Sequence, residues 1–431
     1  MRPPAKISAA LAVFISLVLL SQISIVPASA TPKIPLIKIS TGISIPEVFE
    51  VADFIRFQQG FLVAGNNSED RNLLSFIDEK GALLWSANPL GIQRGFITGM
   101  AVSGTSIFVA GISQGELKIA PSANGVAPTP DASVSAAPTT NASPSASSSA
   151  SAAKNIPLVN PDGVIVGAKE TFREDIANLF LAEIDSSGKV IAITNVTNEK
   201  SFIPTSLATA GNRVFLAGNE YPAEGVQLGA LYVISSAKLQ ASYSYGEKRT
   251  QFNKIIARSS KNLLVVGSSS DVLADRKLAG KIDAVALTIS TTSGKIEKIL
   301  RSSGKGAVRT WDFATGNLTV AGTSEVKKIR ESVITAFSTT GSVTWTARFQ
   351  KSNRAAVAGN CVAVSILGGS KSLTFTPSGP EIFLFTVDSK GRLQKGVRVA
   401  KQQLISLATT VNKGCAVLTY SAETGVRVSF L

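Results

Sequence analysis

The sequence predicts an all-β protein: a single seven-bladed β-propeller with four-stranded blades. Two observations lead to this fold class. Short apolar runs that end in glycine recur as FLVAG (61–65), IFVAG (107–111), VFLAG (214–218), LLVVG (263–267), LTVAG (318–322) and SILGG (365–369). Each run is followed by a second apolar segment, a polar turn and a third segment, as in LLSFIDEKGALLWSA (73–87). A repeated four-stranded unit of about 40–50 residues is typical of a β-propeller.

The composition of these segments supports strands rather than helices. They are rich in Val, Ile, Phe and Thr and are bounded by Gly, Asn, Asp and Ser, which is the pattern of β-strands. CAVLTY (415–420) resembles a seventh copy that has lost its glycine. We therefore count seven blades, with six or eight as the alternatives because sequence patterns fix boundaries poorly.

The two ends of the chain predict how the ring closes. The last unit, from Gln402 to Leu431, has room for three strands only. The segment IPLIKIS (34–40) offers the missing fourth strand. We expect this N-terminal strand to join the C-terminal blade, because closing the ring hides sheet edges that otherwise invite aggregation.

Residues 1–30 have the pattern of a secretory signal peptide. Arg2 and Lys6 precede an apolar stretch, and the segment ends in Ala28-Ser29-Ala30. The apolar stretch is shorter than the ~20 residues that a bilayer span needs. No later stretch is long and apolar enough to span a membrane. We therefore expect a mature propeller of residues 31–431 that is secreted or associated with the cell envelope.

One interval between the repeated glycines, from Gly111 to Gly218, is about double the others. Residues 120–157 account for it, and they consist mainly of Ala, Ser, Pro and Thr without aromatic residues. Such a segment buries too little apolar surface to offset its ordering entropy. We expect a disordered insertion in blade 2, which is either O-glycosylated or a passive spacer.

Several chemistries are excluded by composition. The chain contains no histidine, so it has no Ser-His-Asp triad, no His-ligated zinc and no imidazole acid–base catalyst. We predict no cofactor and no metal site. Cys361 and Cys415 both begin the second strand of adjacent units. They form either a disulfide, as an oxidising compartment favours, or two buried thiols if the ring holds their Cα atoms beyond ~7 Å.

The repeats resemble a known family of propeller proteins. The pairing of IFVAG or LLVVG with NLFLAEIDSSGKVI or IDAVALTISTTSGKI is similar to the seven-bladed repeats of extracellular bacterial proteins, called SBBP repeats. Asp283 matches the acidic position, and Asp78–Gly81, Asp185–Gly188 and Asp388–Gly391 match the turn. The resemblance covers residues 31–431 apart from the insertion. It implies the fold and no catalytic residues.

The polar turns also resemble an enzyme motif in part. Trp85 and Trp345 follow a turn glycine by four residues, as in quinone-dependent dehydrogenase propellers, but the other four turns lack the tryptophan. We interpret the turn as structural. The aspartate accepts local backbone hydrogen bonds, the glycine adopts positive φ, and the tryptophan covers apolar space between blades.

The net charge of +14 is concentrated in the second half of the chain. Residues 241–431 carry 27 basic and 11 acidic side chains, whereas residues 1–240 carry 16 and 18. In a propeller, the loops between second and third strands share one face with the connections between blades. The predicted ligand-binding residues on that face are Arg276, Lys277, Lys281, Arg301, Lys305, Arg309, Lys327, Lys328, Arg330, Lys351 and Arg354. The acidic residues expected there, over blades 1–3, are Glu69, Asp70, Glu170, Glu174, Asp175, Glu220 and Glu224.

These features predict an exported, non-enzymatic module that binds or scaffolds at the cell envelope. The expected partner is an anionic cell-wall polymer or an envelope protein. The alternative is a basic surface that is solvated and binds no partner. The sequence argues against nucleic acid, because aromatic residues are 6% of the chain and none interleave with the basic loops. The enzymatic alternative is a carboxylate-dependent glycan hydrolase or lyase that uses the loop-rich face. The sequence leaves the ligand and the oligomeric state open.

Overall fold

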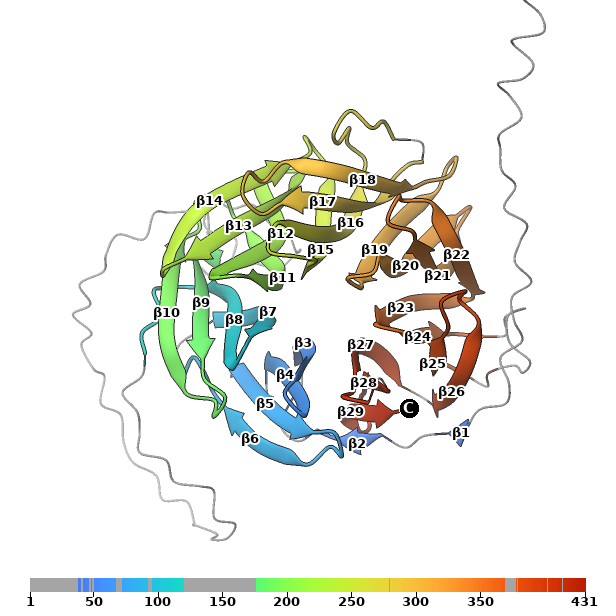
Figure 1. Cartoon of the computed structure of the whole chain (residues 1–431), viewed down its shortest axis with the longest axis horizontal. Helices are drawn as coiled ribbons and strands as arrows, with labels where there is room; N and C mark the ends of the chain where they lie inside the picture. Colours follow the sequence, from blue (N-terminus) through green and yellow to red (C-terminus); the bar gives the residue numbers. More distant parts are fainter. Residues whose placement is uncertain are drawn as a thin grey trace, which may run out of the picture.

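Seven β-sheets surround a central opening in the computed structural model (Figure 1). The structure describes residues 38–39, 42–45, 48, 50–66, 72–91, 95–119, 176–278, 280–368, 377, 379–400, 402–412 and 414–431. The predicted signal peptide (1–30), the predicted insertion (120–157) and residues 34–37 of the predicted closing strand lie outside these ranges. Within the described ranges, no helix is long and apolar enough to cross a membrane.

The first five blades are each formed by four consecutive strands, the first of them nearest the centre (Figure 1). Blade 1 contains β3 (Glu50–Phe57), β4 (Gly60–Asn66), β5 (Asn72–Asp78) and β6 (Leu83–Ala87). Blade 2 contains β7 (Gly95–Ser103), β8 (Ser106–Ser113), β9 (Asn178–Ile184) and β10 (Val190–Thr197). Blade 3 contains β11 (Ile203–Ala210), β12 (Arg213–Ala223), β13 (Val226–Ser235) and β14 (Lys238–Tyr245). Blade 4 contains β15 (Thr250–Ala257), β16 (Asn262–Ser269), β17 (Asp283–Ser290) and β18 (Ile296–Ser302). Blade 5 contains β19 (Val308–Ala314), β20 (Thr319–Val326), β21 (Ile329–Phe337) and β22 (Val343–Gln350).

The last two blades include strands from the N-terminal segment. Blade 6 contains β23 (Ser352–Ala358), β24 (Cys361–Ile366), β25 (Glu381–Val387) and β26 (Leu393–Ala400), with β1 (Lys38–Ile39) added outside β26. Blade 7 contains β27 (Gln403–Thr409), β28 (Cys415–Ser421) and β29 (Gly425–Phe430), completed by β2 (Ile43–Ser44). The predicted all-β, seven-bladed, four-stranded propeller is therefore confirmed.

An N-terminal strand joins the C-terminal blade and closes the ring, as predicted, but its residues differ from the predicted ones. β2 pairs antiparallel with β29, with Ile43 opposite Val428, and the backbone NH of Ile45 donates to the carbonyl of Val426. The described part of the predicted closing strand, β1, instead pairs in parallel with β26 of blade 6. The N-terminal segment thus passes along the outer edge of blade 6 before it completes blade 7. The apolar run IPLIKIS (34–40) did not identify the closing strand correctly, because only a short antiparallel segment is needed at the edge of β29.

Every innermost strand has a β-bulge at the same place. The register shifts fall at Val51/Asp53, Ile97/Gly99, Pro204/Ser206, Phe252/Lys254, Trp311/Phe313, Ser352/Arg354 and Leu404/Ser406. This bulge explains the glycine that ends the second strand. A Cβ atom on Gly65 would lie 2.0 Å from the carbonyl oxygen of Glu50, and one on Gly267 would lie 1.9 Å from that of Gln251. The repeated glycine is therefore a requirement of close backbone approach.

Two blades depart from this glycine rule. In blade 6, Ile366 is opposite Ser352 and so occupies the glycine position. The sequence assignment of Gly369 to that position is wrong by three residues, and Gly369 lies outside the described residues. In blade 7, Thr419 is opposite Leu404, which confirms that this copy has lost its glycine.

The polar turns between third and fourth strands have the predicted chemistry. In blade 1, Asp78 Oδ1 accepts hydrogen bonds from the backbone NH groups of Lys80 and Ala82, both at 2.8 Å. Gly81 has φ of 87°, which only glycine adopts readily. Asp185 and Asp388 make the same pair of backbone contacts in blades 2 and 6.

In several blades, side chains of the outermost strand cover the turn glycine of the next blade. Trp85 on β6 donates its Nε1 hydrogen to the carbonyl of Ser186 at 3.0 Å, and its ring lies over Gly188 of blade 2. Trp345 lies over Gly391 in the same way, from blade 5 to blade 6. The predicted role of these tryptophans between neighbouring blades is thus confirmed. In every blade, we call the two positions of the outermost strand that are equivalent in register to Trp85 and Ala87 the covering positions.

The hydrophobic core lies between neighbouring blades rather than at the centre of the ring. One cluster joins blade 7 to blade 1 and includes Ile45, Phe61 and Leu418. Between blades 6 and 7, Cys361 on β24 and Cys415 on β28 form a disulfide, with their Cα atoms 5.6 Å apart. The two cysteines are fully buried. The ring geometry therefore brings adjacent second strands close enough for the bond that the sequence left open.

Candidate functional site

Eight of the predicted binding residues are exposed at one end of the ring, which we call the loop face. This end contains the loops β16–β17 and β20–β21 and the connections that follow β18 and β22. The exposed residues are Arg276, Lys277, Lys281, Lys305, Lys327, Lys328, Arg330 and Lys351. Because consecutive strands in every blade are antiparallel, these loops and connections reach the same end. The structure therefore brings these basic residues of blades 4 and 5 to a common face.

The tip of the β20–β21 hairpin has an uncommon backbone. Lys327 and Lys328 form a two-residue turn between the paired residues Val326 and Ile329, with φ of 51° and 67°. Such a turn normally contains Asn-Gly or another glycine pair. Non-glycine residues held at positive φ cost about 1 kcal/mol or more each. Ile329 and Val326 are 66% and 36% exposed, so the tip presents two lysines between two exposed apolar side chains.

The neighbouring loop of blade 4 is held firmly by Asp271. Its Oδ2 accepts hydrogen bonds from the backbone NH groups of Glu247, Lys248 and Arg249 and from Thr250 Oγ1, all within 3.1 Å. Burial opposes ionisation of this carboxyl, but these hydrogen bonds together hold its pKa below the usual value. The connection between blades 3 and 4 is thereby fixed against the loop that carries Arg276 and Lys277.

Two predicted binding residues serve the fold instead. Arg301 is in β18, and its Nη1 lies 3.2 Å from Oδ2 of the buried Asp283. Arg309 is in β19 and donates to Ser302 Oγ at 3.0 Å and to the carbonyl of Ser303 at 2.7 Å. Desolvation lowers the pKa of Arg309, and the charge of Arg348 lowers it further. These arginines fix the connection between blades 4 and 5 and have little surface to offer a ligand.

The pair Asp283–Arg301 belongs to a repeated arrangement that the sequence reasoning missed. Glu331 pairs with Arg348 in blade 5, and in blade 6 Glu381 accepts from Arg398 Nε at 2.8 Å. In each of these three blades the acid lies within the first three residues of the third strand, and the arginine lies 17 or 18 residues later on the fourth. This spacing is the signal that the sequence offers, and it indicates that part of the positive charge is neutralised internally.

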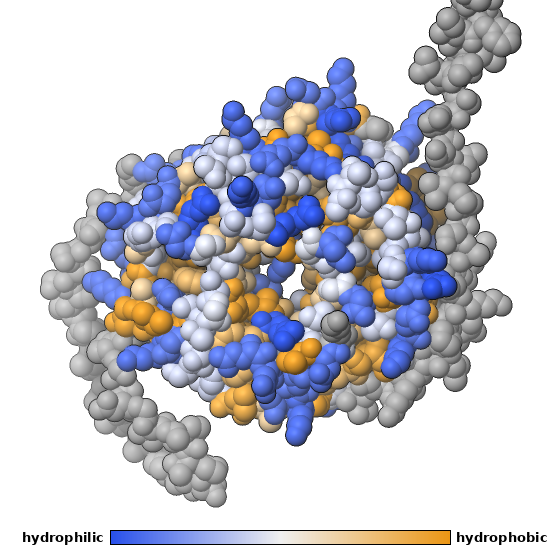
Figure 2. Space-filling model, in the orientation of Figure 1, coloured by the Kyte–Doolittle hydropathy of each residue, from blue (hydrophilic) through white to orange (hydrophobic). Residues whose placement is uncertain are grey.

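Arg354 does not lie in a blade connection, as the sequence predicted. β23 begins at Ser352, so Arg354 belongs to the innermost strand, directly after the bulge. It lines the central channel, whose opening is visible in the space-filling view (Figure 2). The channel contains a cavity of about 420 Å³. Its polar and charged lining residues are Asp53, Thr205, Asn253, Lys254, Asp312, Arg354 and Ser406.

The charges in the channel are of both signs. Lys254 Nζ of blade 4 lies 3.4 Å from Asp53 Oδ1 of blade 1, across the ring. Desolvation raises the pKa of Asp312, although Asn253 Nδ2 and Thr310 Oγ1 donate to its Oδ1 at 2.9 and 3.0 Å. Desolvation lowers the pKa of Arg354, whose guanidinium lies 5.5 Å from the centre of the Phe313 ring. The bulges place these side chains toward the channel, and periodicity alone did not reveal that.

The predicted acidic half of the loop face is only partly described. Glu69, Asp70, Glu170, Glu174 and Asp175 lie outside the described residues. Glu220 is buried, and it accepts hydrogen bonds from Tyr232 Oη at 3.1 Å and Ser244 Oγ at 2.6 Å. Its expected place on an open surface is therefore wrong, whereas Glu224 is exposed. Among the described residues, no three metal-ligating side chains come together.

The fold is similar to several solved β-propellers. The propeller of Dos1 aligns over 89% of this chain and 77% of its own, with 9% identity and a TM-score of 0.46. The acylaminoacyl peptidase of Pyrococcus horikoshii aligns over 89% of this chain and 51% of its own, with 8% identity and a TM-score of 0.46. This chain thus spans about half the length of that enzyme. The propeller domain of the Trilobed protease from Pyrococcus furiosus aligns over 91% and 94%, with 8% identity and a TM-score of 0.41.

No family model matches the sequence, and no curated protein matches it. The likeness to the solved propellers concerns the fold alone. The resemblance to SBBP repeats stays a prediction from the motifs.

Proposed function

We propose that this protein is an exported, non-enzymatic propeller that attaches to an anionic component of the cell envelope through the loop face of blades 4 and 5. The observation that carries the proposal is the β20–β21 tip. Two lysines occupy a turn that glycine or asparagine would form at lower cost, and both are exposed. Lysine at both of these strained positions supports a role for the two side chains themselves.

The surrounding residues support the same partner. Arg276, Lys277 and Arg330 add exposed positive charge on the same face, and Asp271 holds the loop of blade 4 in place. The signal-peptide pattern of residues 1–30 and the resemblance to SBBP repeats favour a location outside the cytoplasm. A basic face attracts anionic polymers and anionic lipid surfaces alike.

The decisive experiment separates the charge of the tip from its fold. Lys327→Asn with Lys328→Gly keeps the turn in its preferred sequence and removes both charges. We expect unchanged or higher thermal stability and about tenfold or greater loss of binding to polyphosphate beads, since each basic residue contributes roughly 1 kcal/mol near an anionic surface. Unchanged binding to polyphosphate and to isolated envelopes would overturn the proposal.

Two further variants complete the design. Charge reversal at Arg276, Lys277, Lys327, Lys328 and Arg330 should abolish retention at 150 mM salt, an ionic strength at which exposed charges more than roughly 8 Å apart are largely screened from each other. Lys80→Asn with Lys390→Asn removes two exposed charges from turns at the opposite face and is the matched control. Ile329→Ser distinguishes the partners: it should weaken binding to phosphatidylglycerol vesicles and leave polyphosphate binding unchanged.

A glycan hydrolase or lyase is the second candidate, and one observation favours it. Asp312 and Asp53 share the channel cavity, and burial raises the pKa of Asp312, as a general acid requires. Release of sugars from cell-wall glycans by the wild-type protein, lost in Asp312→Asn, would establish this activity. Equal product from both proteins would remove the pair from consideration.

A further inference from the structure

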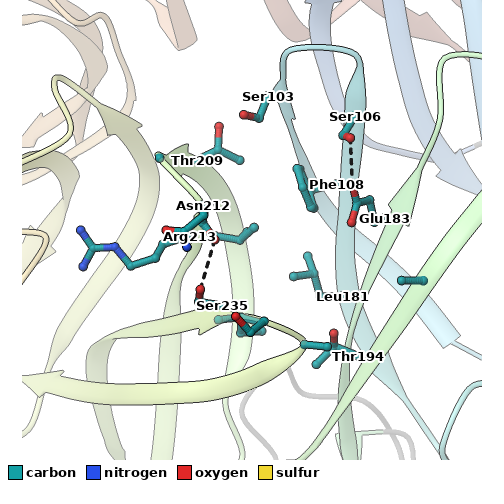
Figure 3. Close-up of a pocket in the computed structure, with 16 residues that line it drawn as sticks. Ser103, Ser106, Phe108, Leu181, Glu183, Thr194, Thr209, Asn212, Arg213 and Ser235 are labelled. Carbon is teal, nitrogen blue, oxygen red and sulfur yellow. Dashed lines mark hydrogen bonds between the residues drawn. The ribbon is translucent and has the colours of Figure 1, made fainter.

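A cavity of about 360 Å³ lies between blades 2 and 3, away from both the loop face and the channel (Figure 3). It is near the turns that join first to second and third to fourth strands. Phe108, Leu181, Val214 and Ile234 supply apolar walls, and Glu183 lies among them. The cavity therefore continues the apolar interface of these two blades to the molecular surface.

The repeat explains why a cavity is found here. At the covering positions, blade 1 has Trp85 and Ala87, and blade 5 has Trp345 and Ala347. Blade 3 has Ala241 and Tyr243, and the Tyr243 ring lies over Gly294 of blade 4.

Blade 4 has Lys298 and Leu300, and both lie over Gly341 of blade 5. Blade 2 has Ala192 and Thr194 in register with these residues, so neither of its covering positions has a large side chain.

The opposite wall of the cavity differs in the same place. The third-to-fourth strand turn of blade 3 is a two-residue hairpin between Ser235 and Lys238, whereas blade 2 has five residues between Ile184 and Val190. Ser236 and Ala237 take positive φ of 50° and 55° without glycine. Both deviations concern a junction whose two covering positions, Ala192 and Thr194, have small side chains.

The cavity also has polar lining residues, among them several serine and threonine side chains, Glu183 and Arg213. Glu183 Oε1 accepts a hydrogen bond from Ser106 Oγ at 2.8 Å, and Ser235 Oγ donates to the carbonyl of Asn212 at 3.2 Å (Figure 3). Arg213 does not compete for Glu183. Its guanidinium donates to the carbonyl of Thr291 at 2.6 Å, at the next junction. Glu183 thus places a carboxyl group beside the apolar walls of the cavity.

We propose that the cavity between blades 2 and 3 binds a small planar aromatic molecule that carries a hydrogen-bond donor or a positive charge, in the place that Trp85 fills between blades 1 and 2. The ring would lie against Phe108, Leu181 and Ile234, as the indole of Trp85 lies against its neighbours. The donor would reach Glu183 or a turn carbonyl, as Trp85 Nε1 reaches Ser186. This site does not depend on the loop face.

Three probes of the same ring test the proposal on the full chain. Indole has no side arm, tryptamine carries a cationic aminoethyl arm, and indole-3-acetate carries an anionic carboxymethyl arm. We expect saturable binding of indole by ligand-observed NMR and by thermal shift, with tryptamine at least about tenfold tighter than indole-3-acetate because hydrogen bonds to ionised groups are the stronger ones. Glu183→Gln should keep indole binding and remove the preference for tryptamine.

Filling the cavity provides the matched variants. Ala192→Trp supplies the ring in covalent form, and it should raise the melting temperature and abolish indole binding. Thr194→Tyr copies Tyr243 of blade 3 and should give the same loss if Ala192→Trp fails to fold. Trp85→Ala opens the equivalent space at blades 1–2 and should create a second indole site. Absence of saturable binding to the wild-type chain, or binding that survives both filling variants, would overturn the proposal.

Discussion

Lys327 and Arg354 show where residue-level prediction holds and where it ends. The position of Lys327 between two apolar runs assigns it to a loop, and the structure places it at the β20–β21 tip. The same reasoning assigns Arg354 to the loop face, but β23 begins earlier and brings it into the channel. A bulge adds one residue to the strand and redirects the side chains that follow. Sequence periodicity does not show where that extra residue falls.

Asp312 gives the molecule a specific pH dependence. Desolvation raises the pKa of Asp312 in the folded protein. At pH values just above the unfolded-state pKa of about 3.9, the folded state therefore binds more protons than the unfolded state. The stability of the wild type relative to Asp312→Asn should therefore fall as pH rises from 4 through the folded pKa of Asp312. Asp312→Asn keeps the acceptor for Asn253 and removes this dependence. Urea unfolding of both proteins at pH 4, 5, 6 and 7 would measure it, and parallel curves would contradict the assignment.

At the scale of the strand, the repeated glycine and the bulge are one feature. The sequence shows the glycine at the end of five second strands, and it is the basis for counting blades. Its physical cause, the carbonyl oxygen that approaches within about 2 Å of a would-be Cβ, is visible only in the paired structure. Ile366 shows the consequence, because a glycine three residues away is not an equivalent position. The strands were predictable, and their register was not.

Gly267 tests this explanation of the repeat. Gly267→Ala should destabilise the protein by about 2–3 kcal/mol, because its Cβ would collide with the backbone of Gln251. Gly316→Ala is the matched control, since a Cβ there meets nothing within 4 Å and the site is exposed. The control should change stability by no more than about 0.5 kcal/mol. Equal effects of the two substitutions in chemical denaturation would refute a role for close backbone approach.

For the whole molecule, ring closure was predictable from the count of strands. Three strands at the C-terminus require a fourth from elsewhere, and the N-terminal segment supplies β2. The disulfide was not predictable, because the distance between second strands of adjacent blades depends on how tightly the ring is packed. The ring also decides which charges remain free. Asp283, Glu331 and Glu381 neutralise arginines of their own blades, which a count of net charge does not reveal.

The bond between Cys361 and Cys415 should contribute strongly to the stability of the closed ring. It links blade 6 to blade 7, the blade that β2 completes, and it closes a loop with a sequence separation of 54. Constraint of the unfolded chain by such a loop stabilises the fold by about 4 kcal/mol. Cys361→Ala with Cys415→Ala should lower the free energy of unfolding by roughly that amount. Dithiothreitol should bring the wild type to the stability of the double variant and leave that variant unchanged. Equal melting temperatures of the oxidised wild type and the double variant would show that packing between the blades alone holds the ring closed.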